Sequence, residues 1–246
     1  MMKTLVIKVG TSTLLGTDEL PSATFEYVAA SIRKLCEQYN IVLVTSGAIG
    51  FGVRQTGSSE RPRDLHQLQA LSMIGQVGLL RRWREAFGDL TVGQVLVTRQ
   101  DLERTVTAGL FRDSVASVWG YDALPIVNEN DAVSTEEISF GDNDRLAAEV
   151  AAVLSAERLI MLTDQDGIQA AFGTPDQRRL DEVSIDEADT HIQAVKSRHG
   201  KGGATSKVEA ARIALEAGVA VHIAHAATAS AIEDALSGKV GTRIVQ

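Results

Sequence analysis

The segment Leu5-Val6-Ile7-Lys8-Val9-Gly10-Thr11-Ser12 decides how the rest of the chain folds. Its apolar, β-branched run is typical of a strand buried in a parallel sheet, and a glycine turn follows it. Lys8 interrupts the run, and a lysine in a core strand costs free energy unless its ammonium group reaches a partner. The segment therefore predicts a buried strand whose carboxyl end carries a functional cation. A partly buried lysine before an ordinary turn is the alternative that this segment leaves open.

Strand-like and helix-like segments alternate along the rest of the chain. We expect strands at 41–44, 90–97, 124–127, 159–162 and 219–223, with a final edge strand at 242–245. We expect helices at 24–38, 65–86, 107–119, 145–155, 206–217 and 230–236. Two segments do not fit this alternation of strands and helices. Residues 132–140 alternate in hydrophobicity like a hairpin at the edge of the sheet, and residues 164–179 are polar and contain Gly and Pro. The alternation predicts an α/β fold, a three-layer αβα sandwich around a mostly parallel sheet.

Composition narrows the class of protein. The chain has 246 residues, enough for one large domain, and 44% of them are hydrophobic. Its net charge of −8 opposes non-specific nucleic-acid binding, which needs a basic surface. A single cysteine excludes an intrachain disulfide framework and a cysteine-rich zinc site. Without a signal-like start or an apolar run of transmembrane length, we expect a cytoplasmic protein with no membrane partner.

Three further segments are rich in small residues: Val44–Gly52 and Leu162–Gly167, which follow strands, and Gly200–Lys207, a glycine-rich loop that enters a helix. Backbone amides and helix N-termini at such turns attract anions. Lys207 in the first turn of a helix would oppose the macrodipole, and a bound phosphate would relieve that conflict. The respective alternatives are tight packing of a helix on a strand, a capped turn and a mobile solvated loop. Neither a Walker A loop nor a Gly-x-Gly-x-x-Gly fingerprint occurs, which disfavours P-loop kinases and dehydrogenases.

The most specific feature is a pair of amide-rich and acidic clusters, Asn128-Glu129-Asn130-Asp131 and Phe140-Gly141-Asp142-Asn143-Asp144. Each alone would usually be a turn. Two in series, both after strand-like segments, are less easily explained as turns alone. Their carboxylates and amides suit an ammonium group, a metal ion or a pair of positioned lysines.

In this order, the motifs resemble the amino acid kinase family and, within it, the glutamate 5-kinases, over essentially the whole chain. The first and last motifs mark the family broadly, whereas the two amide-rich clusters resemble the glutamate 5-kinases in particular. The resemblance implies transfer of the ATP γ-phosphoryl group to the side-chain carboxylate of L-glutamate. The product would be L-glutamyl 5-phosphate, in the first step of proline biosynthesis, with ATP and Mg²⁺ required.

The resemblance also implies roles for residues of this chain. The catalytic groups would be Lys8, Asp144 and Lys207, with Asp144 orienting the lysines. The glutamate-binding residues would be Ser46, Asp131 and Asn143. The ATP-binding residues would be Lys8, Thr163, Asp164, Lys201, Gly202, Gly203, Ala204, Thr205, Ser206 and Lys207. No side chain is expected to ligate a metal ion, and the carboxylate nucleophile, already ionised at neutral pH, needs no general base.

Several expectations concern the protein as a whole. The resemblance implies one kinase domain over 1–246, binding glutamate mainly through its N-terminal part and ATP mainly through its C-terminal part. It would lack the C-terminal RNA-binding-like PUA domain that many members carry. A homodimer or tetramer, feedback inhibition by proline and association with glutamyl phosphate reductase are also implied. Lys201 and the segment 167–175 depart from the family pattern, so the role of Lys201 and the nucleotide preference stay open.

Two other functions compete with this hypothesis. Another enzyme of the same fold would phosphorylate acetylglutamate, carbamate or uridylate, and the clusters at 128–131 and 141–144 argue against it. A non-catalytic sensor of amino acids or nucleotides would not need to keep Lys8, Asp144 and Lys207 together.

Overall fold

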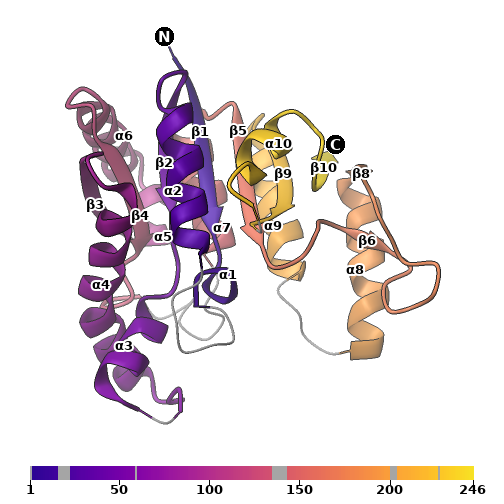
Figure 1. The fold of residues 1–246 in the computed structure, drawn as a ribbon, viewed down its shortest axis with the longest axis horizontal. Helices are drawn as coiled ribbons and strands as arrows, with labels where there is room; N and C mark the ends of the chain where they lie inside the picture. The colour runs from indigo at the N-terminus through magenta and orange to yellow at the C-terminus, as the bar shows by residue number, and fades with distance from the viewer. Residues whose placement is uncertain (1, 16–22, 59, 135–142, 200–203, 227) are drawn as a thin grey trace.

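The computed structural model describes residues 2–15, 23–58, 60–134, 143–199, 204–226 and 228–246, with only the helical backbone for 193–199. Eight strands form one sheet in the order β3-β4-β2-β1-β5-β9-β10-β8 (Figure 1). Their bounds are β1 Lys3–Val9, β2 Tyr39–Val44, β3 Val92–Val97, β4 Leu124–Glu129, β5 Arg158–Thr163, β8 Glu182–Ser184, β9 Ala220–His225 and β10 Thr242–Val245. The polar segment 164–179 contains a separate antiparallel pair, β6 Gln169–Ala170 and β7 Arg178–Arg179.

The strand order places β1 at the centre of the sheet. β1 pairs in parallel with β2 on one side and with β5 on the other. The chain therefore leaves β1 in one direction and later returns on its opposite side. Such a reversal opens a crevice outside the carboxyl ends of the strands, where ligands bind in open α/β sheets. The segment predicted as the first buried strand thus ends at the switch point of the sheet.

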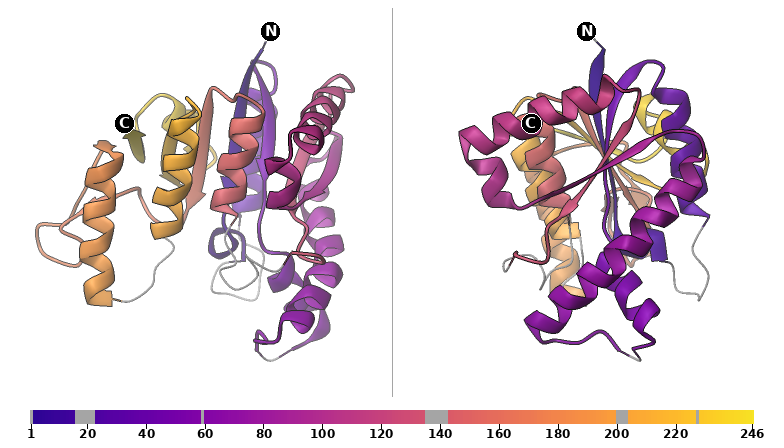
Figure 2. Two further views of the ribbon diagram at one scale, coloured as in Figure 1. Left: turned by 180° about the vertical axis from the view of Figure 1, so that it is seen from behind. Right: turned by 90° about the vertical axis from the view of Figure 1, so that its left-hand side faces the viewer.

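Helices cover both faces of the sheet (Figure 2), which confirms the three-layer αβα prediction. One layer contains α2 Thr24–Leu35, α4 Leu65–Phe87 and α10 Ala231–Leu236, with α3 Ala48–Thr56 packed against α4. The other contains α5 Arg99–Glu103, α6 Thr105–Trp119, α7 Asp144–Val153, α8 Ile185–His199 and α9 Ala204–Glu216. The short helix α1, Thr11–Leu15, follows β1. Among the described residues, no helix combines the length and the apolar character that crossing a membrane requires.

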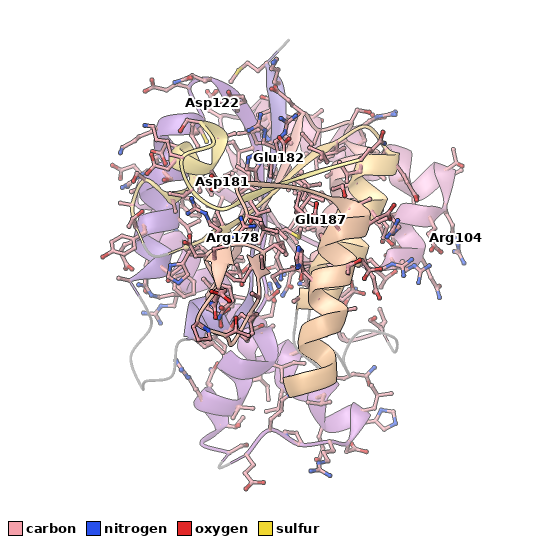
Figure 3. All side chains as sticks on the ribbon, turned by 90° about the vertical axis from the view of Figure 1, so that its right-hand side faces the viewer. Arg104, Asp122, Arg178, Asp181, Glu182 and Glu187 are labelled. Atoms are coloured by element: carbon pink, nitrogen blue, oxygen red, sulfur yellow. The ribbon has the colours of Figure 1, made fainter. Side chains whose placement is uncertain are left out.

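The strand at one edge of the sheet is not the strand that the sequence predicts. The strand at 242–245 forms as predicted, but it pairs with both β9 and β8, so the short strand β8 is the edge. The prediction of a final edge strand was therefore wrong in its position. Asp181 and Glu182 lie at this edge (Figure 3), and Glu182 forms an exposed ion pair with Arg243 at 3.1 Å. A short edge strand with charged side chains discourages pairing with another chain.

Two glycines let α3 and α4 cross at close range. A Cβ atom added to Gly52 would lie 2.0 Å from the Leu71 carbonyl oxygen, and one added to Gly75 would lie 1.9 Å from that of Ala48. Real Cβ atoms do not tolerate such contacts, so only glycine fits at the crossing. The alternative for Val44–Gly52, tight packing of a helix on a strand, is therefore wrong about the partner of Gly52. The packing here is of one helix on another rather than of a helix on a strand.

We expect Gly75→Ala to lower the free energy of unfolding by about 1–3 kcal/mol, the usual cost of overpacking, or more because the clash is with backbone. Chemical denaturation followed by circular dichroism measures the change. Gly109→Ala is the matched control, because Gly109 is also helical but an added Cβ would meet nothing within 4 Å. The control should be neutral or more stable than the wild type. Equal stability of the two variants would contradict the close crossing.

Candidate active site

Three charged side chains meet at the carboxyl end of β1. Lys8 Nζ lies 2.5 Å from Asp144 Oδ1, and Lys207 Nζ lies 2.9 Å from Asp144 Oδ2. Ser206 Oγ donates a hydrogen bond to the same Oδ2 at 2.9 Å. Asp144 is 0% exposed and Lys8 only 1%, so the charges are paired almost out of contact with water. Two cations and one carboxylate sum to +1, which suits an anionic ligand.

The ion group joins elements that are far apart in the sequence. Lys8 lies one residue before the end of β1, Asp144 begins α7, and Lys207 is in the first turn of α9. Because side chains alternate along a strand, Lys8 faces the same layer as Val6, the layer that contains α7 and α9. Asp144 also offsets the unfavourable position of a lysine at the N-terminus of α9.

The other residues expected to bind ATP lie at neighbouring strand and helix ends. Thr163 is the buried last residue of β5, and its hydroxyl donates to Asp164 Oδ1 at 3.1 Å. The first turn of α9 comprises Ala204, Thr205, Ser206 and Lys207. Lys201, Gly202 and Gly203 lie outside the described residues, as do Gly141 and Asp142. The described part thus brings one strand end and one helix N-terminus beside the ion group, a combination that favours phosphate.

On the other side of β1, buried polar groups line the ends of β2 and β4. Asn143 directly precedes Asp144, and its Nδ2 donates to the Thr45 carbonyl oxygen and to Asn128 Oδ1, each at 2.6 Å. Ser46 is 4% exposed, and its hydroxyl has no hydrogen-bond partner among the described residues. A buried hydroxyl without a partner is costly unless a ligand or water satisfies it. The hydrogen bond to Thr45 thus holds Asn143 beside the backbone segment that carries Ser46.

Helix α4 supports this polar region from behind. Trp83 is fully buried and its Nε1 donates to Thr45 Oγ1 at 2.9 Å. Gln76 Oε1 accepts from Asn128 Nδ2 at 2.7 Å. The sequence motifs do not single out Gln76 or Thr45. For Gln76 the sequence carries no signal, because its partner lies 52 residues away.

Two glycines of the strand-end turns act in different ways. Gly47 precedes α3 with φ of +106°, a conformation that other residues rarely adopt. Gly10, in contrast, does not have a positive φ, so its backbone conformation does not require glycine. A Cβ added at Gly10 would lie 3.6 Å from Lys8 Nζ. The missing side chain therefore leaves space beside the ammonium group.

Asp131 lies just beyond β4 in a turn whose Ser134 amide donates to the Asn130 carbonyl oxygen. Burial raises the pKa of Asp131 to about 6, although the positive charge of Arg61 lowers it. A carboxylate in such a place gains most from a cationic ligand, because a cation compensates the lost hydration. The described residues contain no group of three or more His, Cys, Asp and Glu side chains that could hold a metal ion.

The raised pKa of Asp131 has a consequence for stability. Between the ordinary aspartate pKa of 3.8 and the raised pKa of about 6, the folded state binds more protons at this carboxyl than the unfolded state does. The free energy of unfolding therefore falls as pH rises through this window. We expect the Tm of Asp131→Asn minus that of the wild type to increase between pH 4 and pH 6. Above pH 6 this difference should stay constant. Asp113→Asn, at an exposed carboxyl, is the control, and a pH-independent difference for Asp131→Asn would contradict the shift.

Comparison with known proteins identifies the family. The family model "Amino acid kinase family" matches residues 3–225. Glutamate 5-kinase of Gloeobacter violaceus is 41% identical over 98% of this chain and 68% of its own length. Glutamate 5-kinase of Cutibacterium acnes is 42% identical over 97% of this chain and 62% of its own length. The chain thus spans about two thirds of the length of these curated relatives.

Solved structures agree on the fold. Carbamate kinase from Giardia lamblia bound to AMP-PNP matches with a TM-score of 0.70 and 18% identity, over 99% of this chain and 98% of its own. UMP kinase from Ureaplasma parvum matches with a TM-score of 0.68 and 14% identity over the whole of both chains. At such low identity these likenesses establish the fold alone. The family model and the curated relatives show that the chain belongs to the amino acid kinase family and, within it, to the glutamate 5-kinases.

Proposed function

We propose that this chain transfers the γ-phosphoryl group of ATP to the side-chain carboxylate of L-glutamate, giving L-glutamyl 5-phosphate for proline biosynthesis. The observation that carries the proposal is the buried ion group Lys8–Asp144–Lys207 at the switch point of the sheet. Membership of the glutamate 5-kinases supports the choice of substrates. The attacking carboxylate is ionised at neutral pH, so the protein must bring two anions together rather than remove a proton.

The two lysines supply the positive charge that the reaction needs. In phosphoryl transfer, charge spreads over the oxygens of the transferred group, and preorganised cations stabilise it without reorganising. Asp144 holds both ammonium groups at fixed positions through separate oxygens, Oδ1 and Oδ2. We propose that Lys8 and Lys207 contact the transferring phosphoryl group and that Asp144 orients them.

The polar region beside the ion group fits an α-amino acid. We propose that Asp131 pairs with the α-ammonium group, and that Ser46 and Asn143 provide further hydrogen bonds. Acetylglutamate, carbamate and UMP lack a free ammonium group, so none of them would compensate the partly buried Asp131 carboxylate. This argument favours glutamate over the substrates of the other enzymes with this fold.

For ATP, we propose that the first turn of α9, the residues 201–203 before it, and Thr163 and Asp164 surround the phosphates. Mg²⁺ would bind together with ATP, through the phosphate oxygens, and would neutralise part of their charge. The ion usually binds phosphates and water rather than a site made only of protein side chains. From family membership we further propose a cytoplasmic homo-oligomer, a dimer or tetramer, that proline inhibits. Glutamyl phosphate reductase is the proposed partner, because acyl phosphates hydrolyse readily.

The proposal is tested by ADP release with MgATP and four acceptors: L-glutamate, acetylglutamate, carbamate and UMP. We expect turnover with L-glutamate only, and hydroxylamine should trap its acyl phosphate as a hydroxamate. Lys8→Ala and Lys207→Ala should each lower kcat by roughly 10²–10³, as loss of one preorganised donor typically does. Lys34→Ala is the control, because Lys34 is 70% exposed on α2.

The possible outcomes separate the competing functions. Turnover with acetylglutamate, carbamate or UMP instead of L-glutamate would show that the chain is a different enzyme of the same fold. Nucleotide and glutamate binding without any hydroxamate would favour the sensor. Near-wild-type kcat in either lysine variant would remove that lysine from the reaction.

A further inference from the structure

A chain of buried amide side chains runs from α4 to the start of α7. Gln76 Oε1 accepts from Asn128 Nδ2 at 2.7 Å, and Asn128 Oδ1 accepts from Asn143 Nδ2 at 2.6 Å. All three are buried, with exposed fractions of 9% for Gln76, 2% for Asn128 and 7% for Asn143. The chain ends one residue before Asp144, which holds the two lysines.

Backbone groups fix which way the asparagine amides point. The Thr45 carbonyl oxygen can only accept a hydrogen bond, so the Asn143 atom 2.6 Å away must be its nitrogen. That nitrogen also donates to Asn128 Oδ1, and both of its hydrogens are then used. The remaining polar atom of Asn143 is Oδ1, an acceptor. Asn143 is therefore set to bind a donor group on a substrate.

Asn128 occupies the middle of the chain and depends on Gln76. Its Oδ1 accepts both from Asn143 and from the Glu129 backbone N–H at 3.0 Å. Its Nδ2 must therefore find a separate acceptor, and Gln76 Oε1 is that acceptor. Without it, a buried donor would be left unpaired. Asn128 could then recover a partner only by rotating, and rotation would break its hydrogen bond to Asn143.

We propose that Gln76 is a positioning residue that acts through Asn128 to hold Asn143 with its Oδ1 available to a donor on the substrate. The inference rests on the proposed function and adds that the donor to Asn143 is the same α-ammonium group of L-glutamate that pairs with Asp131. Gln76 thus contributes to the choice of an α-amino acid over a dicarboxylic acid that lacks the amino group. It touches neither substrate nor reacting atoms.

The test compares Gln76→Met, which removes the acceptor at similar size, with Gln76→Glu, which keeps it. We expect Gln76→Met to raise KM for L-glutamate roughly tenfold or more, as small misplacements of binding groups do, with KM for ATP nearly unchanged. The preference for L-glutamate over glutarate, measured as a ratio of kcat/KM, should fall in parallel. Gln76→Glu should restore both values. Ser72→Ala is the matched control, because Ser72 is buried on the same helix and its hydroxyl donates to the Gln69 carbonyl oxygen of that helix.

A second readout does not depend on the substrate. In the wild type, the side-chain amide hydrogens of Asn143 should exchange slowly with solvent by NMR, and Gln76→Met should speed their exchange. Unchanged KM and unchanged exchange in a folded Gln76→Met variant would overturn the inference. If Gln76→Glu raised KM for L-glutamate as much as Gln76→Met does, or if Gln76→Met lowered kcat/KM equally for L-glutamate and glutarate, the role of Gln76 would be structural only. If the wild type does not phosphorylate glutamate, the proposed function fails, and the exchange measurement still decides the positioning role.

Discussion

The structure depends on one buried interaction, in which Asp144 is shared by the ammonium groups of Lys8 and Lys207. Burying three charges is costly, and the cost is offset only where each charge is closely paired. The formal charges of these three side chains sum to +1. A phosphoryl group in transfer carries the complementary charge. The group that stabilises the approach of β1, α7 and α9 is therefore also the group that is best placed to act on a phosphate.

The start of α7 connects the two halves of the proposed site. Asp144 faces the lysines, while its neighbour Asn143 bonds to the ends of β2 and β4. A shift of this helix terminus would move the ion group and the hydrogen-bonded amides of Asn143 and Asn128 together. Helix α4 restrains such a shift through Gln76 and Trp83, and the glycine crossing at Gly52 and Gly75 sets the distance of α3 from α4. Packing thus ties the two halves of the proposed site to one helix terminus.

Periodicity in the sequence was enough to predict most of the sheet and its covering helices. The order of the strands could not be predicted in this way, because the pairing of β10 with β8 depends on contacts between distant segments. Lys8 was predictable because a lysine in an apolar strand needs a partner, and Asp144 was predicted through the family resemblance. The role of Gln76 could not be predicted, because a glutamine on an amphipathic helix is usually exposed to solvent and only the fold shows that this one is buried. The space that Gly10 leaves beside Lys8 could not be predicted either, because it depends on where the folded lysine side chain lies.

The central claim is that the charge of the Lys8–Asp144–Lys207 group binds the transferring phosphoryl group. A crystal structure with MgADP, aluminium fluoride and L-glutamate tests it directly, because the fluoride complex imitates that group during transfer. The account predicts that the nitrogens of both lysines lie within about 2.7–3.2 Å of the fluoride ligands, with Asp144 still between them. An aluminium fluoride group bound away from both lysines, with the ion group unchanged, would contradict it.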